Sequence, residues 1–323
     1  MSVENNLKEK AGEIMEDLEL LVGYSSTNLP LKVDPVFIKD KGGIDSLVFT
    51  KTCINNLSTY AYSLAKSTEG KIGMVLKPCD TRSIIQLLSE ELFERDKIKM
   101  IVVGCSGIIA YKKVQKYLKG LRIISGKIEG DSLEVGTIEG KHSLKSKEFY
   151  ADKCYWCKIY NNPPLFDEFI ENEKELDAVP REKYEDLDQF ESMGLDKIYS
   201  YWEEQFGQCI RCYACRNICP LEICRERCIT HLEVPHWQSQ RINSDEGRFF
   251  QLIRVMHLAG RCTGCGECER ACPKNIPISK LMKKSGQIIE RLFDYRTGED
   301  PKKRPPLLTF KDVEENIKEE KIV

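Results

Sequence analysis

The feature that most constrains this chain is the crowding of cysteine in its second half. The 323 residues include 15 cysteines, and ten of them fall between positions 209 and 272. Two stretches there repeat one spacing: Cys209-Ile-Arg-Cys212-Tyr-Ala-Cys215-Arg-Asn-Ile-Cys219-Pro220 and Cys262-Thr-Gly-Cys265-Gly-Glu-Cys268-Glu-Arg-Ala-Cys272-Pro273. A disulfide-stapled scaffold would be short and secreted, so cysteines repeated in this way predict metal ligands instead.

The spacing of the two motifs predicts two 4Fe–4S clusters. Three thiolates from one loop can hold three corners of a 4Fe–4S cube, and the Cys-Pro cysteine ligates the other cluster in two-cluster proteins. The predicted ligands are Cys209, Cys212, Cys215 and Cys272 for one cluster, and Cys262, Cys265, Cys268 and Cys219 for the other. The alternative is a pair of zinc sites, which need only two Cys-x-x-Cys pairs per ion. The complete eight-cysteine repeat favours iron–sulfur clusters.

The first half of the chain has the pattern of an α/β domain. Apolar residues at helical spacing predict a helix over 3–21. The apolar runs 72–76 and 100–103 indicate buried strands, and a helix around 84–88 separates them. Strand, helix and strand over about 30 residues form a βαβ unit with parallel strands. Glycines divide 121–150 into several short strands, which we expect to pair antiparallel.

The chain divides into four predicted parts. An α/β domain is expected over 1–165, an acidic linker over 166–194, a mainly α-helical two-cluster domain over 195–295 and an extended tail over 296–323. Between Asp167 and Glu191, 11 acidic residues face 3 basic ones, a balance typical of a solvated segment. The proline-bearing tail is expected to run across a surface of this chain or of a partner.

Cysteines of the first half follow two neighbouring strands. Cys79 follows the strand 72–76, and Cys105 follows the strand 100–103. Parallel strands bring both thiols to the carboxyl edge of the sheet, where open α/β sheets bind ligands. Strands lie about 4.8 Å apart, or about 10 Å with one strand between them, and a cubane can be held across either gap. Cys154-Tyr-Trp-Cys157 supplies a further pair, although buried strand-end thiols beside an unrelated zinc half-site remain the alternative.

Both halves resemble known families. The spacer over 220–261 is longer than a compact bacterial ferredoxin needs, and residues 195–292 resemble the helical dicluster ferredoxins of heterodisulfide reductase small subunits and succinate dehydrogenase iron–sulfur subunits. Pro-Cys, then Gly-Cys, then Cys-x-x-Cys resembles the β subunits of deazaflavin-coenzyme-reducing hydrogenases and dehydrogenases. That family holds a 4Fe–4S cluster beside a flavin.

A related group matches more of the chain, over about 71–278. These are the two-part iron–sulfur subunits that accompany anaerobic sulfite reductases, soluble hydrogenases, formate dehydrogenases and heterodisulfide-reductase-type flavoproteins. Three motifs carry this resemblance: Lys77-Pro-Cys-Asp80, Cys154-Tyr-Trp-Cys157 and His257-Leu-Ala-Gly-Arg-Cys-Thr-Gly-Cys-Gly-Glu-Cys-Glu-Arg-Ala-Cys-Pro273. The resemblance implies anaerobic metabolism and a third 4Fe–4S cluster on Cys79, Cys105, Cys154 and Cys157. A flavin of the chain's own is not expected, because no Gly-x-Gly-x-x-Gly and no P-loop is present.

The remaining cysteines and histidines have weaker patterns. Cys224 and Cys228 are four apart, as neighbours on one helix face are, and His231 lies close behind. With His236 they could bind zinc or support a further cluster, but we expect ordinary packed residues. Packed or surface roles without a predicted partner are also expected for Cys53 (on an expected helix), His142 and His257.

Charged residues lie within both cluster loops. Positive charge stabilises the reduced, more negative cluster and raises its potential. The arginines that would do so are Arg211, Arg216, Arg261 and Arg270, and Glu267 and Glu269 oppose them. Composition alone does not show whether the positive or the negative charges have the larger effect on the reduction potential.

Composition excludes several classes of function. The net charge is −2 without a basic surplus, so no nucleic-acid partner is expected. No apolar run of about 18 residues occurs, which argues against a transmembrane segment. The first 20 residues lack the apolar centre of a signal peptide, so a cytoplasmic location is expected. No nucleophile elbow or catalytic triad is recognisable.

These features favour a non-catalytic electron-transfer subunit. It would relay single electrons between a flavoprotein and a terminal oxidoreductase in an anaerobic multi-subunit complex, docking through the linker and the tail. Its partners would be the flavoprotein and the catalytic redox subunits. The alternative is a flavin-containing oxidoreductase subunit acting on a deazaflavin or nicotinamide coenzyme. A regulatory protein with structural clusters is a third reading, which the absence of a basic stripe disfavours.

Overall fold

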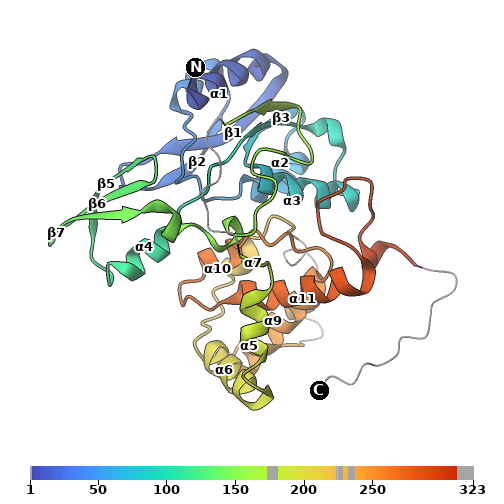
Figure 1. Cartoon of the computed structure of the whole chain (residues 1–323). Coiled ribbons are helices and arrows are strands. Elements are labelled where there is room, and N and C mark those ends of the chain that lie inside the picture. The colour runs from blue at the N-terminus through green and yellow to red at the C-terminus, as the bar shows by residue number, and fades with distance from the viewer. Residues whose placement is uncertain (1, 173–180, 223, 225–227, 232–236, 311–323) are drawn as a thin grey trace.

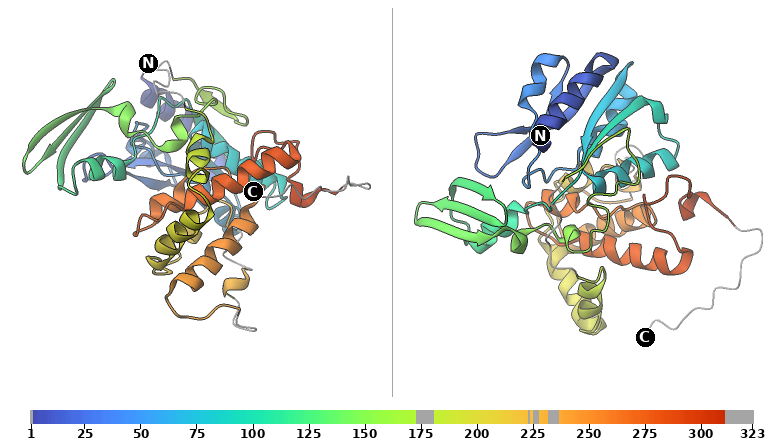
Figure 2. Two further views of the ribbon diagram at one scale, coloured as in Figure 1. Left: turned by 60° about the horizontal axis from the view of Figure 1, so that its bottom comes forward. Right: turned by 45° about the horizontal axis from the view of Figure 1, so that its top comes forward.

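The computed structural model describes residues 2–172, 181–222, 224, 228–231 and 237–310 (Figure 1). An α/β half is built from the first part of the chain, and a cluster of helices from the later part packs against it (Figure 2). A small antiparallel sheet projects from the side of the α/β half. In the described part of the chain, no helix is long and apolar enough to cross a membrane.

The α/β half is organised around a five-stranded sheet. Its strands are β1 (Leu18–Ser26), β2 (Val33–Ile38), β3 (Lys71–Leu76), β4 (Ile98–Val103) and β8 (Glu168–Ile170), in the order β2-β1-β3-β4-β8. Only β2 runs antiparallel to its neighbour. The predicted βαβ unit is confirmed, because β3 and β4 pair in parallel and α3 (Pro78–Ser89) connects them. Strand β8 extends this sheet from within the stretch predicted to be a linker.

Two predicted helical assignments are wrong. Helix α1 ends at Ile14, a short 3-10 turn follows, and the chain enters β1 at Leu18. The apolar residues of β1 are buried because this strand lies inside the sheet, and a short apolar run cannot be told from a helix by periodicity alone. Cys53 lies on irregular chain between two 3-10 helices, where its buried Sγ accepts from the backbone N–H of Thr50.

The small sheet and two short helices complete this half. As predicted, the glycine-divided stretch forms antiparallel strands: β5 (Ile123–Glu129), β6 (Ser132–Thr137) and β7 (Gly140–Lys145). The helices are α2 (Ala61–Ser67) and α4 (Tyr111–Tyr117).

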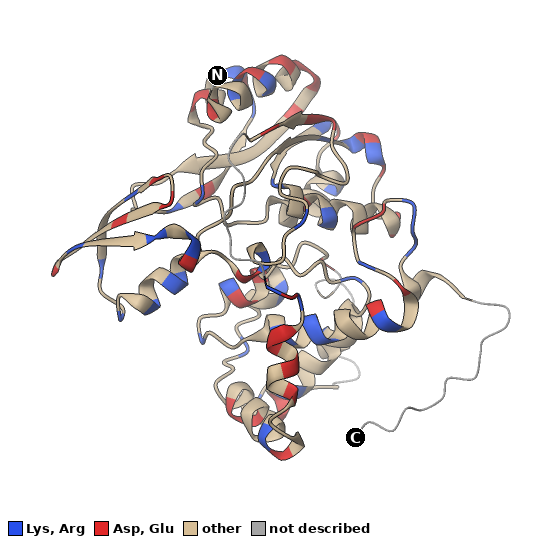
Figure 3. Ribbon diagram, in the orientation of Figure 1, with Lys and Arg blue, Asp and Glu red and all other residues tan. Residues whose placement is uncertain are grey.

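The later part of the described chain is helical, as predicted. Its helices are α5 (Glu185–Glu191), α6 (Leu195–Gly207), α7 (Ala214–Asn217), α9 (Ser244–Leu258), α10 (Glu267–Ala271) and α11 (Ile278–Phe293). Acidic residues concentrate on α5 (Figure 3). Two of them pair with α11, Asp186 with Lys283 and Glu191 with Lys284, so the predicted solvated charge run is partly neutralised within the chain.

The two halves meet at helix α3. The guanidinium of Arg82 donates to the backbone oxygens of Thr263, at 3.2 Å, and Thr297, at 2.6 Å. Arg261 forms a two-pronged ion pair with Glu90 at the end of the same helix. The start of the tail therefore lies on this chain's own surface.

Candidate iron–sulfur centres

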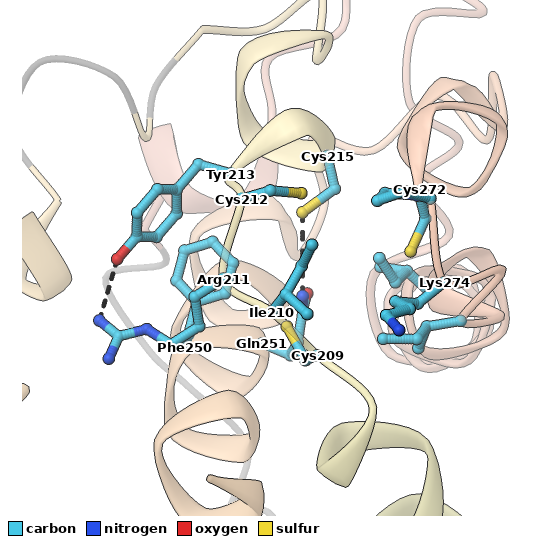
Figure 4. A pocket seen from close by; sticks show the side chains of 13 residues that line it. Cys209, Ile210, Arg211, Cys212, Tyr213, Cys215, Phe250, Gln251, Cys272 and Lys274 are labelled. Atoms are coloured by element: carbon cyan, nitrogen blue, oxygen red, sulfur yellow. Dashed lines mark hydrogen bonds between the residues drawn. The ribbon is translucent and has the colours of Figure 1, made fainter. Parts of the chain in front are cut away.

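Four cysteines line the pocket drawn in Figure 4. They are Cys209, Cys212, Cys215 and Cys272, hereafter the first set. Their sulfur atoms point toward a common space. Three come from the loop between α6 and the end of α7, and the fourth follows α10. Cys272 of the second motif thus joins three cysteines of the first, the exchange that the spacing predicts.

The second set completes the exchange. It consists of Cys219, Cys262, Cys265 and Cys268, which line a common cavity. Burial raises the pKa of Cys268, and the nearby sulfurs of the other three members raise it further. The two sets are therefore interlocked, since each contains the Cys-Pro cysteine of the other motif.

The two motifs share an unusual backbone conformation. The residues before and after the central cysteine have positive φ in both loops: Arg211 at 50° and Tyr213 at 59°, and Gly264 at 70° and Gly266 at 76°. In each loop the first of these donates its N–H to the first cysteine sulfur, Arg211 to Cys209 and Gly264 to Cys262. Successive amides turned inward in this way form a concave site for an anion.

The first loop adopts this conformation without glycine. A left-handed non-glycine residue costs about 1–2 kcal/mol, and the Arg211 side chain offsets this cost with hydrogen bonds. Its guanidinium donates to the backbone oxygens of Ser239 and Arg241 and to the Tyr213 hydroxyl, the last two at 2.9 Å. Arg211 is thereby a structural residue of the loop, a role that its charge alone did not indicate.

The third set consists of the predicted cysteines of the α/β half. Cys79 lies in the first turn of α3, Cys105 lies two residues after β4, and Cys154 and Cys157 follow β7. Cys105 interacts electrostatically with Cys154 and Cys79, and Cys157 interacts with Cys79 and Cys154. The structure therefore brings all four together at the carboxyl edge of the sheet.

A buried ion pair holds the turn that carries Cys79. Lys77 Nζ lies 2.7 Å from Asp80 Oδ2, and both side chains are fully buried. Lys77 also donates to the Tyr24 hydroxyl at 2.6 Å and to the Asn55 carbonyl at 2.7 Å. Every proton of this ammonium is thus used, which makes the turn rigid.

The thiols of these sets suit a multinuclear cluster. Among the residues that the structure describes, no three donor atoms of the first, second or third set lie within 4.8 Å of one another. A single zinc ion needs sulfur atoms closer together, about 3.8 Å apart for Zn–S bonds of about 2.3 Å. Burial raises the pKa of Cys79 to about 12, so such a thiol becomes a thiolate only beside a strong positive charge such as a metal.

All four cysteines of the second set, and Cys79, Cys154 and Cys157 of the third, line one cavity of about 2450 Å³ between the two halves. The Lys153 ammonium is buried there and has no hydrogen-bond partner among the described residues. Burial alone would lower the pKa of Lys153, but the neighbouring Cys79 and Asp80 raise it. A buried ammonium beside thiols can serve as a counter-charge when those thiols become thiolates.

A second buried cation, Arg254, lies among the sulfurs. Its side chain is 1% exposed, and its guanidinium donates to the Cys215 carbonyl at 3.1 Å and to the Gln251 amide oxygen at 3.2 Å. Burial would lower its pKa, but the thiols around it raise it: Cys215, Cys268, Cys219 and Cys224. Sequence reasoning missed Arg254, although it lies one turn from both Phe250 and Leu258, on the buried stripe of α9.

The loop arginines themselves are largely compensated. Arg261 pairs with Glu90, and Arg270 pairs with Glu267 at 2.7 Å. Arg216 donates to the neighbouring Asn217. Arg254 and Lys153, both outside the predicted group, also place buried positive charge near cysteines of the three sets.

The structure gives His257 a partner that the sequence did not indicate. Its Nδ1 lies 3.5 Å from Cys224 Sγ, and Cys228 lies beside both. A hydrogen bond with Cys224 lowers the pKa of the Cys228 thiol below its ordinary value. The other histidines considered for this place, the His231 side chain and all of His236, lie outside the described residues.

Comparison with known proteins agrees with the predicted resemblance. Residues 205–276 match the family described as a 4Fe-4S dicluster domain, so this segment carries the signature of a two-cluster protein. The chain is 26% identical over 297 residues to the F420-dependent formate dehydrogenase subunit beta of Methanocaldococcus jannaschii, covering 74% of this chain and 76% of that protein. The F420-dependent formate dehydrogenase 1 subunit beta of Methanococcus maripaludis is 23% identical with the same coverage.

Among solved structures, the F420-reducing NiFe hydrogenase complex from Methanosarcina barkeri contains a similar chain. The TM-score is 0.37 and the sequence identity 14%, and the match covers 65% of this chain and 86% of that one.

Proposed function

We propose that this chain is the iron–sulfur electron-transfer subunit of a multi-subunit redox complex, relaying single electrons between a flavoprotein and a terminal oxidoreductase. The observation that carries the proposal is the continuity of the three cysteine sets. Cysteines of the third and second sets line one cavity, and the second and first sets are interlocked because each contains the Cys-Pro cysteine of the other motif. The similarity to formate dehydrogenase beta subunits supports a place in a complex of that kind. A cytoplasmic location remains part of this proposal.

Each set would hold one 4Fe–4S cluster. Bound clusters of this type supply one-electron redox chemistry with little rearrangement, at potentials set by hydrogen bonds, charge and solvent exposure. The chain would contribute four thiolates per set and the backbone N–H groups of both loops. Arg254 and Lys153 contribute the buried positive charge.

The first set reaches the protein surface, where a partner could bind. Cys212 is exposed, and the adjoining Ile210 is 45% exposed, whereas Cys209, Cys215 and Cys272 are buried. An apolar residue at the surface beside a cluster ligand suits a transient contact with a second redox protein. The route through the chain would then run from the third set through the second to the first.

Metal content tests the proposal. The protein would be purified anaerobically, and iron, sulfide and flavin would be measured per chain. We expect about 12 iron atoms and no flavin, the content of three cubanes. Cys79→Ser should reduce the iron to about 8, while Cys53→Ser, a buried cysteine outside all three sets, should leave it at about 12. A wild-type content of about 8 would contradict the third cluster.

The size and charge of the shared cavity favour a second candidate, the flavin-containing subunit. Small-molecule pockets usually measure about 300–1,000 Å³, and this cavity is larger. Basic residues line it, including Lys112, Lys113, Lys116, Lys158 and Arg181, as an anionic coenzyme would require. Stoichiometric flavin released by acid would make this chain the flavoprotein itself and would exclude a pure relay.

A further inference from the structure

We propose that Cys224, Cys228 and His257 form a mononuclear zinc site, separate from the three cysteine sets. Their donor atoms, two sulfurs and a ring nitrogen, all lie within 4.8 Å of one another. Both cysteines are buried, and His257 is half-buried on the last turn of α9. Thiolate together with imidazole is a donor combination that zinc commonly takes.

The spacing of these atoms distinguishes the site from the others. Zn–S bonds of about 2.3 Å and Zn–N bonds of about 2.0 Å place tetrahedral ligand atoms about 3.5–3.8 Å apart. Cys224 Sγ and His257 Nδ1 are 3.5 Å apart, which fits one ion between them. The sets assigned to cubanes contain no group of three donors within 4.8 Å, again among the described residues. The donor atoms of this site are therefore close enough for a single metal ion, whereas those of the three cysteine sets are farther apart.

The location of the site gives it a structural task. Cys224 and Cys228 follow Cys219 along the chain, and His257 precedes Cys262 by five residues. Cys219 and Cys262 both belong to the second set, but they reach it from different segments. A zinc ion bound here would tie these two segments together. These residues would supply three of the four corners of the tetrahedron, and a water molecule would supply the fourth.

Metal analysis and X-ray absorption on the wild-type protein test the site directly. The anaerobically purified full chain should contain about one zinc per chain in addition to iron. Zinc-edge spectra should fit two sulfur and two nitrogen or oxygen neighbours. Absence of zinc would overturn the proposal. So would zinc with four sulfur neighbours, because that would mean zinc in a cysteine set. Both outcomes are independent of the iron count that tests the electron-transfer function.

Variants connect the ion to these residues. His257→Ala and Cys228→Ser should lose at least tenfold in bound zinc while retaining cluster iron, and His142→Ala, on the exposed sheet, should lose neither. The zinc-free variants should also lose iron faster to a chelator, and only about one cubane's worth, that of the second set. Zinc retained in His257→Ala would refute the assignment. If a variant fails to fold, the zinc-edge X-ray absorption spectrum of the wild-type protein still shows whether zinc has two sulfur neighbours.

Discussion

Removing the buried charge of Arg254 should lower the reduction potentials of the neighbouring clusters. Arg254→Met keeps an apolar chain of similar length on the buried stripe of α9 but deletes the guanidinium. That group donates to the backbone of Cys215, and its charge acts on sulfurs of both the first and the second set. A reduced cluster carries one more negative charge, so the loss of a nearby cation disfavours reduction.

The magnitude follows from Coulomb's law. For a guanidinium and a cluster charge about 8 Å apart, the interaction is worth about 2 kcal/mol at an effective dielectric constant of about 20. At about 59 mV for each tenfold change in a one-electron equilibrium, this corresponds to about 90 mV. Because Arg254 is 1% exposed, solvent screens the interaction little. Both interlocked clusters should shift downward.

Anaerobic redox titration followed by electron paramagnetic resonance measures the shift. Arg248→Met is the matched control, since Arg248 lies on the same helix with its charge near solvent and paired with Asp245. It should move the potentials by less than about 20 mV, because surface charges are screened. Arg254→Lys keeps the charge and should recover most of the 90 mV. Equal shifts in Arg254→Met and Arg248→Met, at unchanged iron content, would refute the electrostatic argument.

Three further predictions concern the scaffold. Lys77→Met leaves the Asp80 carboxylate buried without its ion-pair partner and should lower the free energy of unfolding by about 3–5 kcal/mol, as measured by denaturant titration. The double variant Lys77→Met/Asp80→Asn should recover much of this loss. An unchanged free energy of unfolding in Lys77→Met would contradict a stabilising role of the buried pair. Gly298→Ala would place a Cβ 2.2 Å from a backbone oxygen of α3 at φ 69°, costing about 1–3 kcal/mol and exposing the tail to limited proteolysis. Gly130→Ala, at φ 60° with open space, is its control and should leave the tail protected. Truncation after Tyr295 should weaken co-purification of partner subunits without loss of iron, and undiminished co-purification would exclude the tail as a docking element.

Local patterns predicted much of the fold and of the candidate site. Strand–helix–strand periodicity was enough for the parallel pair β3 and β4, and for the position of Cys79 and Cys105 at one sheet edge. Periodicity failed at 18–21, where a strand buried inside the sheet has the same apolar run as a helix. The neighbours of β1 decide that question, and they come from 33–38 and 71–76.

The amino-acid order alone predicted the grouping of the eight cysteines of the two motifs, because ligand spacing within a loop and the Cys-Pro exchange are properties of short segments. Only the tertiary structure brought Arg254 and Lys153 to the sulfurs, placed cysteines of the second and third sets on one cavity, and paired His257 with Cys224. These residues lie on elements whose neighbours are distant in the chain. Their charge and burial are consequences of packing, and no local pattern records them.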